Sequence, residues 1–256
     1  MQISCCIDMM FSYLDFYDRF YAAAKCGIKT VEFWKWTNKD LGKIKEELRR
    51  NDMNVSIFNI DSRDEKLSYD LSRGILNDGR KDDFLRALDE STPVYKEIGA
   101  CAMIVLIGEN APFDAESVYS ALAAAAPVVE KAGVNLIVEP LNAVDRVGYS
   151  MPYAKPMFDI LRRVGSPNIK LLYDIYHQNM TGDFSIDDIR NNIDIIGHFH
   201  VADAPGRHEP GSGKVDYVKI LKEISKLDYN GYIGLEYRAT KNDAETFAFL
   251  EEVNDV

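Results

Sequence analysis

The feature of this sequence that most constrains its fold is a regular alternation of short apolar runs with longer helix-like segments. Short unbroken runs rich in β-branched and aliphatic residues are typical of strands buried on both faces of a parallel sheet. Eight such runs cover residues 3–7, 30–34, 55–60, 102–107, 135–139, 169–174, 195–202 and 232–237. Eight segments with apolar residues at three- and four-residue spacing follow them, at 14–25, 40–51, 81–98, 115–131, 154–164, 186–192, 215–226 and 243–253.

Helix-ending signals support this division. Gly27, Gly99, Gly133 and Gly165 each stand between a helical segment and a strand, where a residue in the left-handed conformation ends a helix. Dividing 256 residues among eight units gives 32 residues each, a natural size for a (β/α)8 barrel. A doubly wound open sheet is the alternative, but no G-x-G-x-x-G motif follows the first strand. We therefore predict an α/β protein with one domain over residues 1–256, a TIM barrel, with a long irregular loop at 61–79.

Composition narrows the classes of function. Apolar residues make up 46% of the chain and charged residues 28%, which excludes intrinsic disorder. Lys and Arg number 30 against 41 Asp and Glu, a net charge of −11 that disfavours nucleic acid and anionic membranes as partners. We expect an enzyme whose substrate is a small molecule. The composition is also compatible with a homo-oligomer.

The N-terminus and the cysteines favour a cytoplasmic protein. The chain begins without a basic region and reaches the acidic Asp8 directly after its first apolar run, which is unlike a signal peptide. No apolar run approaches the roughly 18 residues that span a bilayer. We expect the cysteines, which lie in apolar stretches and form no C-x-x-C pair, to be reduced core residues. They are Cys5, Cys6, Cys26 and Cys101.

Ionisable residues stand at the ends of four successive predicted strands: Glu139, Asp174, His200 and Glu236. In a TIM barrel, side chains at the carboxyl ends of the strands converge on the barrel mouth. Taken singly, each glutamate could be a solvated rim residue and the histidine a core residue. Charges in apolar strands are costly unless paired or metal-bound, so the four together indicate a metal site. Three carboxylates and one imidazole suit Mn²⁺ or Mg²⁺.

Further polar residues follow three of these strands and are candidates for binding the substrate. His177 comes three residues after Asp174, and we place it in a loop over the site. The Gly- and Pro-rich segment 203–213 carries Arg207, whose guanidinium can bind a carboxylate or phosphate through two hydrogen bonds, and His208. This segment could also be an ordinary exposed connection. Asn142 and Asp145 either contact substrate hydroxyls or cap the next helix.

Several of these motifs together resemble a known family. VEPLN, YDIYHQN, HFHVADAPGRHEPGSGKVDY and GYIGLEY are similar to the hydroxypyruvate isomerase family, part of a xylose isomerase-like TIM-barrel superfamily that also contains the ketose 3-epimerases. The similarity covers the second half of the chain, and APGRHEPGSGKVDY is its most specific part. The resemblance implies one divalent ion on Glu139, Asp174, His200 and Glu236. It also implies acid–base roles for the two glutamates, with His177 and Arg207 on the substrate oxygens.

Two features depart from the isomerase pattern. A glutamine often stands where this chain has His200, whereas the sugar epimerases carry a histidine there. Lys35 and Trp36 also differ from the best-known isomerases, and we expect them to change the wall of the substrate pocket.

We predict a metal-dependent isomerase that interconverts a short hydroxy-keto acid and its aldehyde isomer through an enediolate, as in hydroxypyruvate and tartronate semialdehyde. A ketose or keto-acid 3-epimerase on the same site is the main alternative. A lyase or dehydratase and a non-catalytic sugar-binding barrel rank below it, and four intact metal-ligand positions weigh against the latter. The net charge and the four histidines disfavour an endonuclease with three zinc ions.

Overall fold

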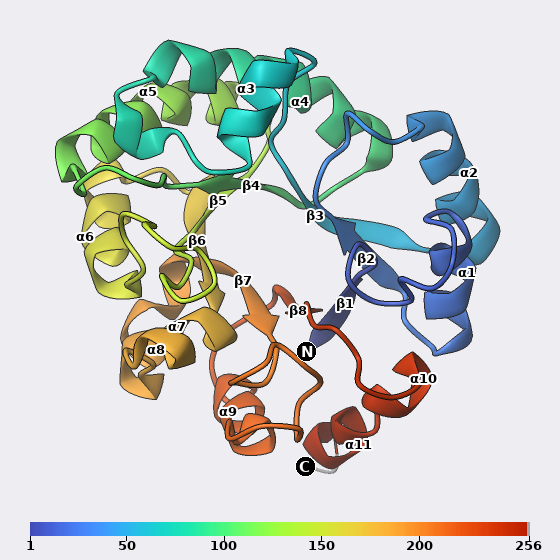
Figure 1. Cartoon of the computed structure of the whole chain (residues 1–256). Helices are drawn as coiled ribbons and strands as arrows, with labels where there is room; N and C mark the ends of the chain where they lie inside the picture. The colour runs from blue at the N-terminus through green and yellow to red at the C-terminus, as the bar shows by residue number, and fades with distance from the viewer. Residues whose placement is uncertain (255–256) are drawn as a thin grey trace.

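Eight parallel strands close into a barrel in the computed structural model, which describes residues 1–254 (Figure 1). Each strand pairs with the next along the chain, and β8 pairs with β1 through contacts such as Ile3 with Ile233. The strands are β1 (Gln2–Cys6), β2 (Thr30–Phe33), β3 (Asn54–Asn59), β4 (Ala102–Leu106), β5 (Leu136–Glu139), β6 (Ile169–Asp174), β7 (Ile196–Val201) and β8 (Tyr232–Leu235). The predicted TIM barrel is confirmed, and the open-sheet alternative is wrong.

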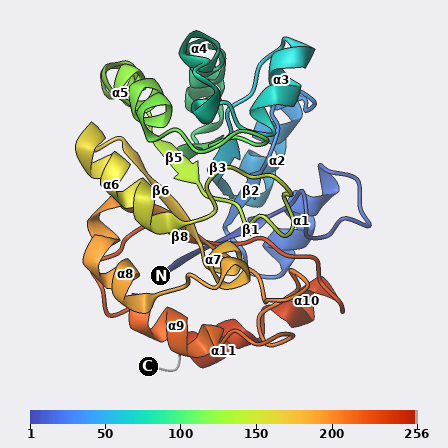
Figure 2. The same cartoon turned by 60° about the vertical axis from the view of Figure 1, so that its left-hand side comes forward.

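The helices form the outer layer around the strands, as Figures 1 and 2 show. They are α1 (Asp18–Lys25), α2 (Leu41–Asn51), α3 (Glu65–Leu71), α4 (Lys81–Ile98), α5 (Ala115–Ala132), α6 (Ala154–Val164), α7 (Ile175–Thr181), α8 (Ile186–Asn192), α9 (Tyr217–Ile224), α10 (Asp243–Thr246) and α11 (Phe249–Asn254), with 3₁₀ turns η1 (Leu76–Asp78) and η2 (Ile193–Ile195). No helix within residues 1–254 is long and apolar enough to cross a membrane.

Parts of the sequence-based assignment of helices are wrong. The segment 61–79 is not an irregular loop, because α3 and η1 lie in it. Asp64 caps α3 by accepting a hydrogen bond of 2.9 Å from the Leu67 N–H, and Leu67 and Leu71 are buried four residues apart. The expected last helix, 243–253, is divided into α10 and α11.

The four glycines adopt the predicted left-handed conformation, with φ between 65° and 79°.

The expectation that the four cysteines are core residues is correct for only some of them. Cys5 and Cys6 are buried, Cys26 is half-buried and Cys101 is exposed. Cys101 lies just before β4 begins, so the apolar run after it is the buried strand and Cys101 itself is outside the core.

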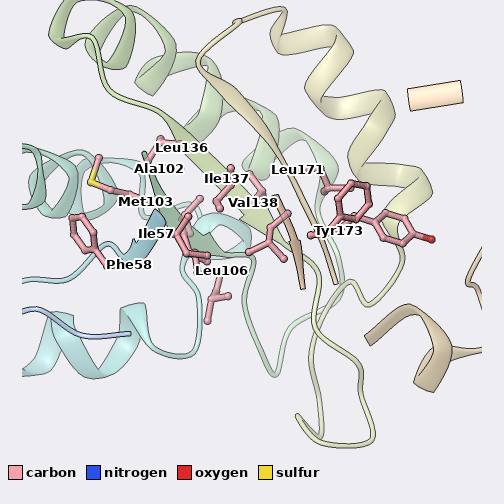
Figure 3. Close-up of a cluster of buried hydrophobic side chains, with 14 of the residues drawn as sticks. Ile57, Phe58, Ala102, Met103, Leu106, Leu136, Ile137, Val138, Leu171 and Tyr173 are labelled. Atoms are coloured by element: carbon pink, nitrogen blue, oxygen red, sulfur yellow. The ribbon is translucent and has the colours of Figure 1, made fainter. Parts of the chain in front are cut away.

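Neighbouring strands carry a continuous set of buried apolar side chains. Figure 3 shows side chains of β3, β4, β5 and β6 packed together, among them Ile57, Met103, Val138 and Leu171, none more than 2% exposed. Burying a side chain of this size contributes roughly 1.5–3 kcal/mol. This packing fixes the strands, and therefore fixes where the polar residues at their carboxyl ends lie.

Candidate active site

The structure brings the four predicted metal ligands together at the carboxyl ends of the strands. Glu139 and Asp174 end β5 and β6, His200 is on β7, and Glu236 follows β8 directly. Each side chain offers one ligand atom, and these four atoms lie within 4.8 Å of one another. His200 Nδ1 is 3.4 Å from Glu139 Oε1, 3.3 Å from Glu236 Oε2 and 4.0 Å from Asp174 Oδ2. This donor set, one nitrogen and three carboxylate oxygens around a common centre, fits a divalent ion.

Burial affects the ionisation of the three carboxylates differently. Burial raises the pKa of Asp174 to about 7, although His200 and Arg207 oppose the rise, and it also raises the pKa of Glu139. Burial acts in the same direction on Glu236, but Arg207 and His200 outweigh it and hold the pKa of that carboxyl well below its usual range. A cation among these groups would favour their charged forms, which is the requirement of a metal site.

The other side of His200 faces a buried carboxylate, Glu32, on β2. Glu32 Oε1 lies 2.9 Å from His200 Nε2, and Glu32 Oε2 lies 3.2 Å from His198 Nε2. These contacts are electrostatic, because the ring N–H groups are not aligned as hydrogen bonds. Ser4 and Ser56 donate hydrogen bonds of 2.5 Å and 3.1 Å to Glu32 Oε2. The carboxylate favours a proton on Nε2 of His200, so that Nδ1 is the atom offered to a metal.

Glu32 is ionised and tightly enclosed. Burial opposes its charge, but His200 and His198 outweigh burial and lower the pKa of Glu32 to about 2. Gly234 on β8 leaves the space for this group. A Cβ atom there would lie 2.6 Å from His198 Nε2 and 2.7 Å from both Glu32 carboxylate oxygens. A side chain at position 234 would therefore collide with this group.

Two side chains bind the two carboxylate oxygens of Glu236. The Arg207 guanidinium contacts Oε2, and the Trp34 indole N–H donates a hydrogen bond of 2.8 Å to Oε1. The guanidinium also lies 5.4 Å from the centre of the Tyr176 ring. Glu236 is therefore held in one orientation by Arg207 and Trp34, which come from the segments that follow β7 and β2.

His177 lies in the first turn of α7 and not in a loop, because Asp174 caps that helix by accepting a hydrogen bond from the His177 N–H. Its Nδ1 accepts a 3.1 Å hydrogen bond from the Asn142 backbone, and its Nε2 lies 3.4 Å from Asp174 Oδ2. Burial and the nearby Arg207 lower the pKa of His177 well below its usual value. The ring is therefore neutral, and with Nδ1 accepting, Nε2 carries the proton.

Some of the remaining candidates for substrate binding line the cavity beside the cluster, and others do not. His177 and Arg207 line a cavity at the barrel mouth, whereas Asn142, Asp145 and His208 do not. Asn142 and the Tyr176 hydroxyl both donate to Asp145, at 3.0 Å and 2.6 Å. Asn142 and Asp145 therefore hold His177 and Tyr176 in place.

His208 is directed away from the cavity. Its Nδ1 lies 2.8 Å from the carbonyl oxygen of Arg238. Trp36 does not line the cavity either, because its ring is buried and donates to Ser91 Oγ at 3.1 Å. The expectation that Trp36 changes the pocket wall is wrong, and Lys35 alone of that pair reaches the cavity.

The cavity has a volume of 310 Å³. Sequence reasoning missed several of its polar lining residues, although most follow the carboxyl end of a strand, which is the available signal. They are Asp8, Asn38, Lys39, Asn59, Asp61, Ser72 and Arg146. A volume near the lower end of the roughly 300–1,000 Å³ range of ligand pockets suits a small polar metabolite.

Comparison with known proteins identifies the relatives of this chain. Residues 20–253 match the family model described as xylose isomerase-like TIM barrel. The chain is 31% identical over 245 residues to hydroxypyruvate isomerase of Escherichia coli K12, covering 93% of each protein. It is also 31% identical to 2-oxo-tetronate isomerase of Cupriavidus necator, covering 96% of this chain and 95% of that protein.

Solved structures share the fold. A Brucella melitensis protein described as AP endonuclease, family 2, is 25% identical and superposes with a TM-score of 0.89, covering 99% of both chains. D-Allulose 3-epimerase from Methylomonas sp. is 17% identical with a TM-score of 0.73, covering 97% of this chain and 88% of that one. At that identity, the second likeness concerns the fold only.

Proposed function

Because this chain belongs to the xylose isomerase-like TIM barrel family, and within it to the hydroxypyruvate isomerases, we propose that it interconverts a short hydroxy-keto acid and its aldehyde isomer. Hydroxypyruvate and tartronate semialdehyde are the type example. The observation that carries the proposal is the buried cluster of Glu139, Asp174, His200 and Glu236, of which Glu139 and Glu236 line a cavity large enough for such a molecule.

The chemistry moves a proton between adjacent carbons through an enediolate. A divalent ion on the four ligands would polarise the carbonyl and stabilise the developing negative charge. Among the protein groups, Glu139 suits the first proton transfer. Its pKa is raised by burial, and a base whose pKa lies nearer to neutral exchanges protons more effectively. The proton on Glu139 would then pass to solvent, and Glu236 would deliver a proton taken up from solvent to the neighbouring carbon, in an orientation fixed by Arg207 and Trp34.

His177 and Arg207 complete the site. The neutral His177 ring offers its Nε2–H, a buried donor without a hydrogen-bond partner in residues 1–254, to a substrate oxygen. Such a hydrogen bond strengthens as negative charge develops on that oxygen. Arg207 compensates the charge of Glu236 and lies on the cavity wall, where it can contact the same developing charge.

A 3-epimerase is the second candidate, and His200 favours it because the resemblance associates histidine at this position with the sugar epimerases. The two glutamates of the cluster could then act on opposite faces of one carbon.

The test is a panel of keto acids and ketoses incubated in D₂O with protein loaded with Mn²⁺ or Mg²⁺ and followed by NMR. We expect deuterium at the carbon next to the carbonyl of a short keto acid, together with the aldehyde isomer. Label at C3 of a ketose with inversion at that carbon would favour the epimerase. If no compound acquires label with either metal, the proposal of enzymatic isomerisation is wrong.

A further inference from the structure

The cavity wall carries four cationic side chains, and only one of them has no carboxylate partner in the described residues. Lys39 Nζ lies 3.2 Å from Asp8, Arg146 lies 2.6 Å from Glu109, and Arg207 contacts Glu236. Within residues 1–254, no carboxylate oxygen lies within 4.0 Å of the Lys35 ammonium. Lys35 is therefore the cation on this wall whose charge the described protein leaves uncompensated.

Lys35 is nevertheless held in place. Its ammonium donates hydrogen bonds to Ser68 Oγ at 2.9 Å and to the Ser68 carbonyl at 3.2 Å, on α3. The carbonyl of Lys35 accepts a 2.8 Å hydrogen bond from Lys39, which fixes the backbone of this segment. An ammonium has three N–H donors, so two are used and one remains for the cavity. A half-buried positive charge without a counter-ion favours an anionic ligand.

A second polar group on the wall has no partner in the described chain. The Oδ1 atom of Asn59, at the end of β3, is buried without a hydrogen-bond donor. It can accept a hydrogen bond from a hydroxyl group of a ligand. A buried acceptor of this kind is costly unless a ligand or water satisfies it.

We propose that Lys35 binds the carboxylate of the substrate, and that Asn59 accepts a hydrogen bond from a hydroxyl farther along its chain. The inference rests on the proposed isomerase function and names the substrate class as hydroxylated 2-keto acids of four or more carbons. In a three-carbon acid, the carboxylate, the carbonyl and the single hydroxyl leave no further hydroxyl for Asn59. Arg207, whose guanidinium is already paired with Glu236, is secondary for recognising the acid.

The experiment compares Lys35→Met and Lys35→Gln with wild type on matched acid and neutral substrates. The pairs are hydroxypyruvate with dihydroxyacetone, and 2-oxo-tetronate with erythrulose. Each neutral partner replaces the carboxylate by a hydroxymethyl group. Losing a charge-assisted hydrogen bond should lower kcat/KM for the acids by roughly 10- to 100-fold, and for the neutral compounds by less than about 3-fold. Lys66→Met, on the exposed side of α3, is the matched control.

Equal losses on acid and neutral partners, or no loss on the acids, would overturn the role of Lys35. Asn59→Leu should lower kcat/KM for 2-oxo-tetronate more than for hydroxypyruvate, and an equal effect would overturn the assignment of Asn59. Binding of erythronate and of erythritol to the metal-loaded protein, measured by calorimetry, separates this inference from the proposed function. If wild type turns over none of the four substrates, the isomerase proposal fails, and selective loss of erythronate binding in Lys35→Met still decides whether Lys35 binds a carboxylate.

Discussion

The carboxylate of Glu32 lies 2.9 Å from Nε2 of His200, on the side of the ring opposite the three carboxylates that surround Nδ1. Burial alone would lower the pKa of His200, but Glu236 and Glu32 outweigh it and raise that pKa well above its usual value. The imidazole therefore lies between Glu32 on one side and the three carboxylates of the cluster on the other. A carboxylate behind a metal-binding histidine orients the ring and makes it a stronger ligand.

Glu32→Gln should weaken metal binding while the barrel stays folded. The variant keeps the size of the side chain but removes the charge that favours a proton on Nε2 of His200. Loss of such a supporting group typically reduces metal affinity by about 10- to 100-fold. Calorimetric titration with Mn²⁺ measures the change. Glu46→Gln, at an exposed position on α2, is the control and should bind as wild type does. An unchanged Kd in Glu32→Gln would show that Glu32 has no influence on the site.

Gly234→Ala tests how tightly the group around Glu32 is enclosed. The added methyl would lie 2.6 Å from His198 Nε2 and 2.7 Å from the Glu32 oxygens, so these side chains must move. Overpacking of this kind lowers the free energy of unfolding by roughly 1–3 kcal/mol. Urea denaturation of metal-free protein measures it. A variant as stable as wild type, with unchanged Mn²⁺ affinity, would mean that the group adjusts freely.

The four residues at the strand ends could be predicted because each follows an apolar run. In a parallel barrel, that position alone implies that the side chains meet. Asp174 shows where such reasoning stops. It serves both as a candidate ligand and as the cap of α7, so the helix begins with no intervening loop, and His177 is buried in it. The capping signal was present, but a strand followed directly by a helix leaves no turn residues to mark the boundary.

Glu32 could not be assigned from sequence in the same way. A charge inside the apolar segment TVEFW indicates that it is paired, but its partners come from β1, β3 and β7 and are distant in sequence. Only the closed barrel brings them together. The position of His208 could not be predicted from sequence for a different reason. The sequence marks the Gly- and Pro-rich segment, but the direction of each side chain depends on backbone turns, and those of this loop direct His208 to the Arg238 carbonyl.

Mn²⁺ binding should weaken as the pH falls below about 7. Burial raises the pKa of Asp174 to about 7, so above that pH the carboxylate is ionised, and below it the metal must displace a proton. The raised pKa of His200 acts in the same direction, because Nδ1 must lose its proton to bind a metal. We expect the apparent affinity to fall by about tenfold per pH unit for each proton displaced. Calorimetry in two buffers of different ionisation enthalpy counts the protons released. An affinity independent of pH between about 5.5 and 7.5 would contradict the placement of the ion on Asp174 and His200.

Glu139→Gln and Glu236→Gln separate an active isomerase from a barrel that only binds metal. Each change keeps the size and one oxygen of the side chain but removes a base and a negative charge. Assayed with saturating metal, each variant should keep measurable bound metal, while kcat falls by roughly 10² or more. The double variant should be little worse than the worse single one, because residues that act as a unit are not additive. Glu46→Gln again serves as the control.

Deuterium exchange distinguishes the two glutamates from each other. Within residues 1–254, no ion pair or hydrogen bond joins Glu139 to Arg207 or Trp34, and burial raises its pKa, so it is the better candidate for the first proton transfer. Glu139→Gln should therefore lose exchange of solvent deuterium into substrate altogether. Glu236→Gln should still exchange label into substrate without completing turnover, because only the delivery of a proton to the neighbouring carbon is blocked. If both variants convert substrate at the wild-type rate, the mechanism with two carboxylates is wrong. If Glu236→Gln loses exchange and Glu139→Gln keeps it, the two roles are reversed.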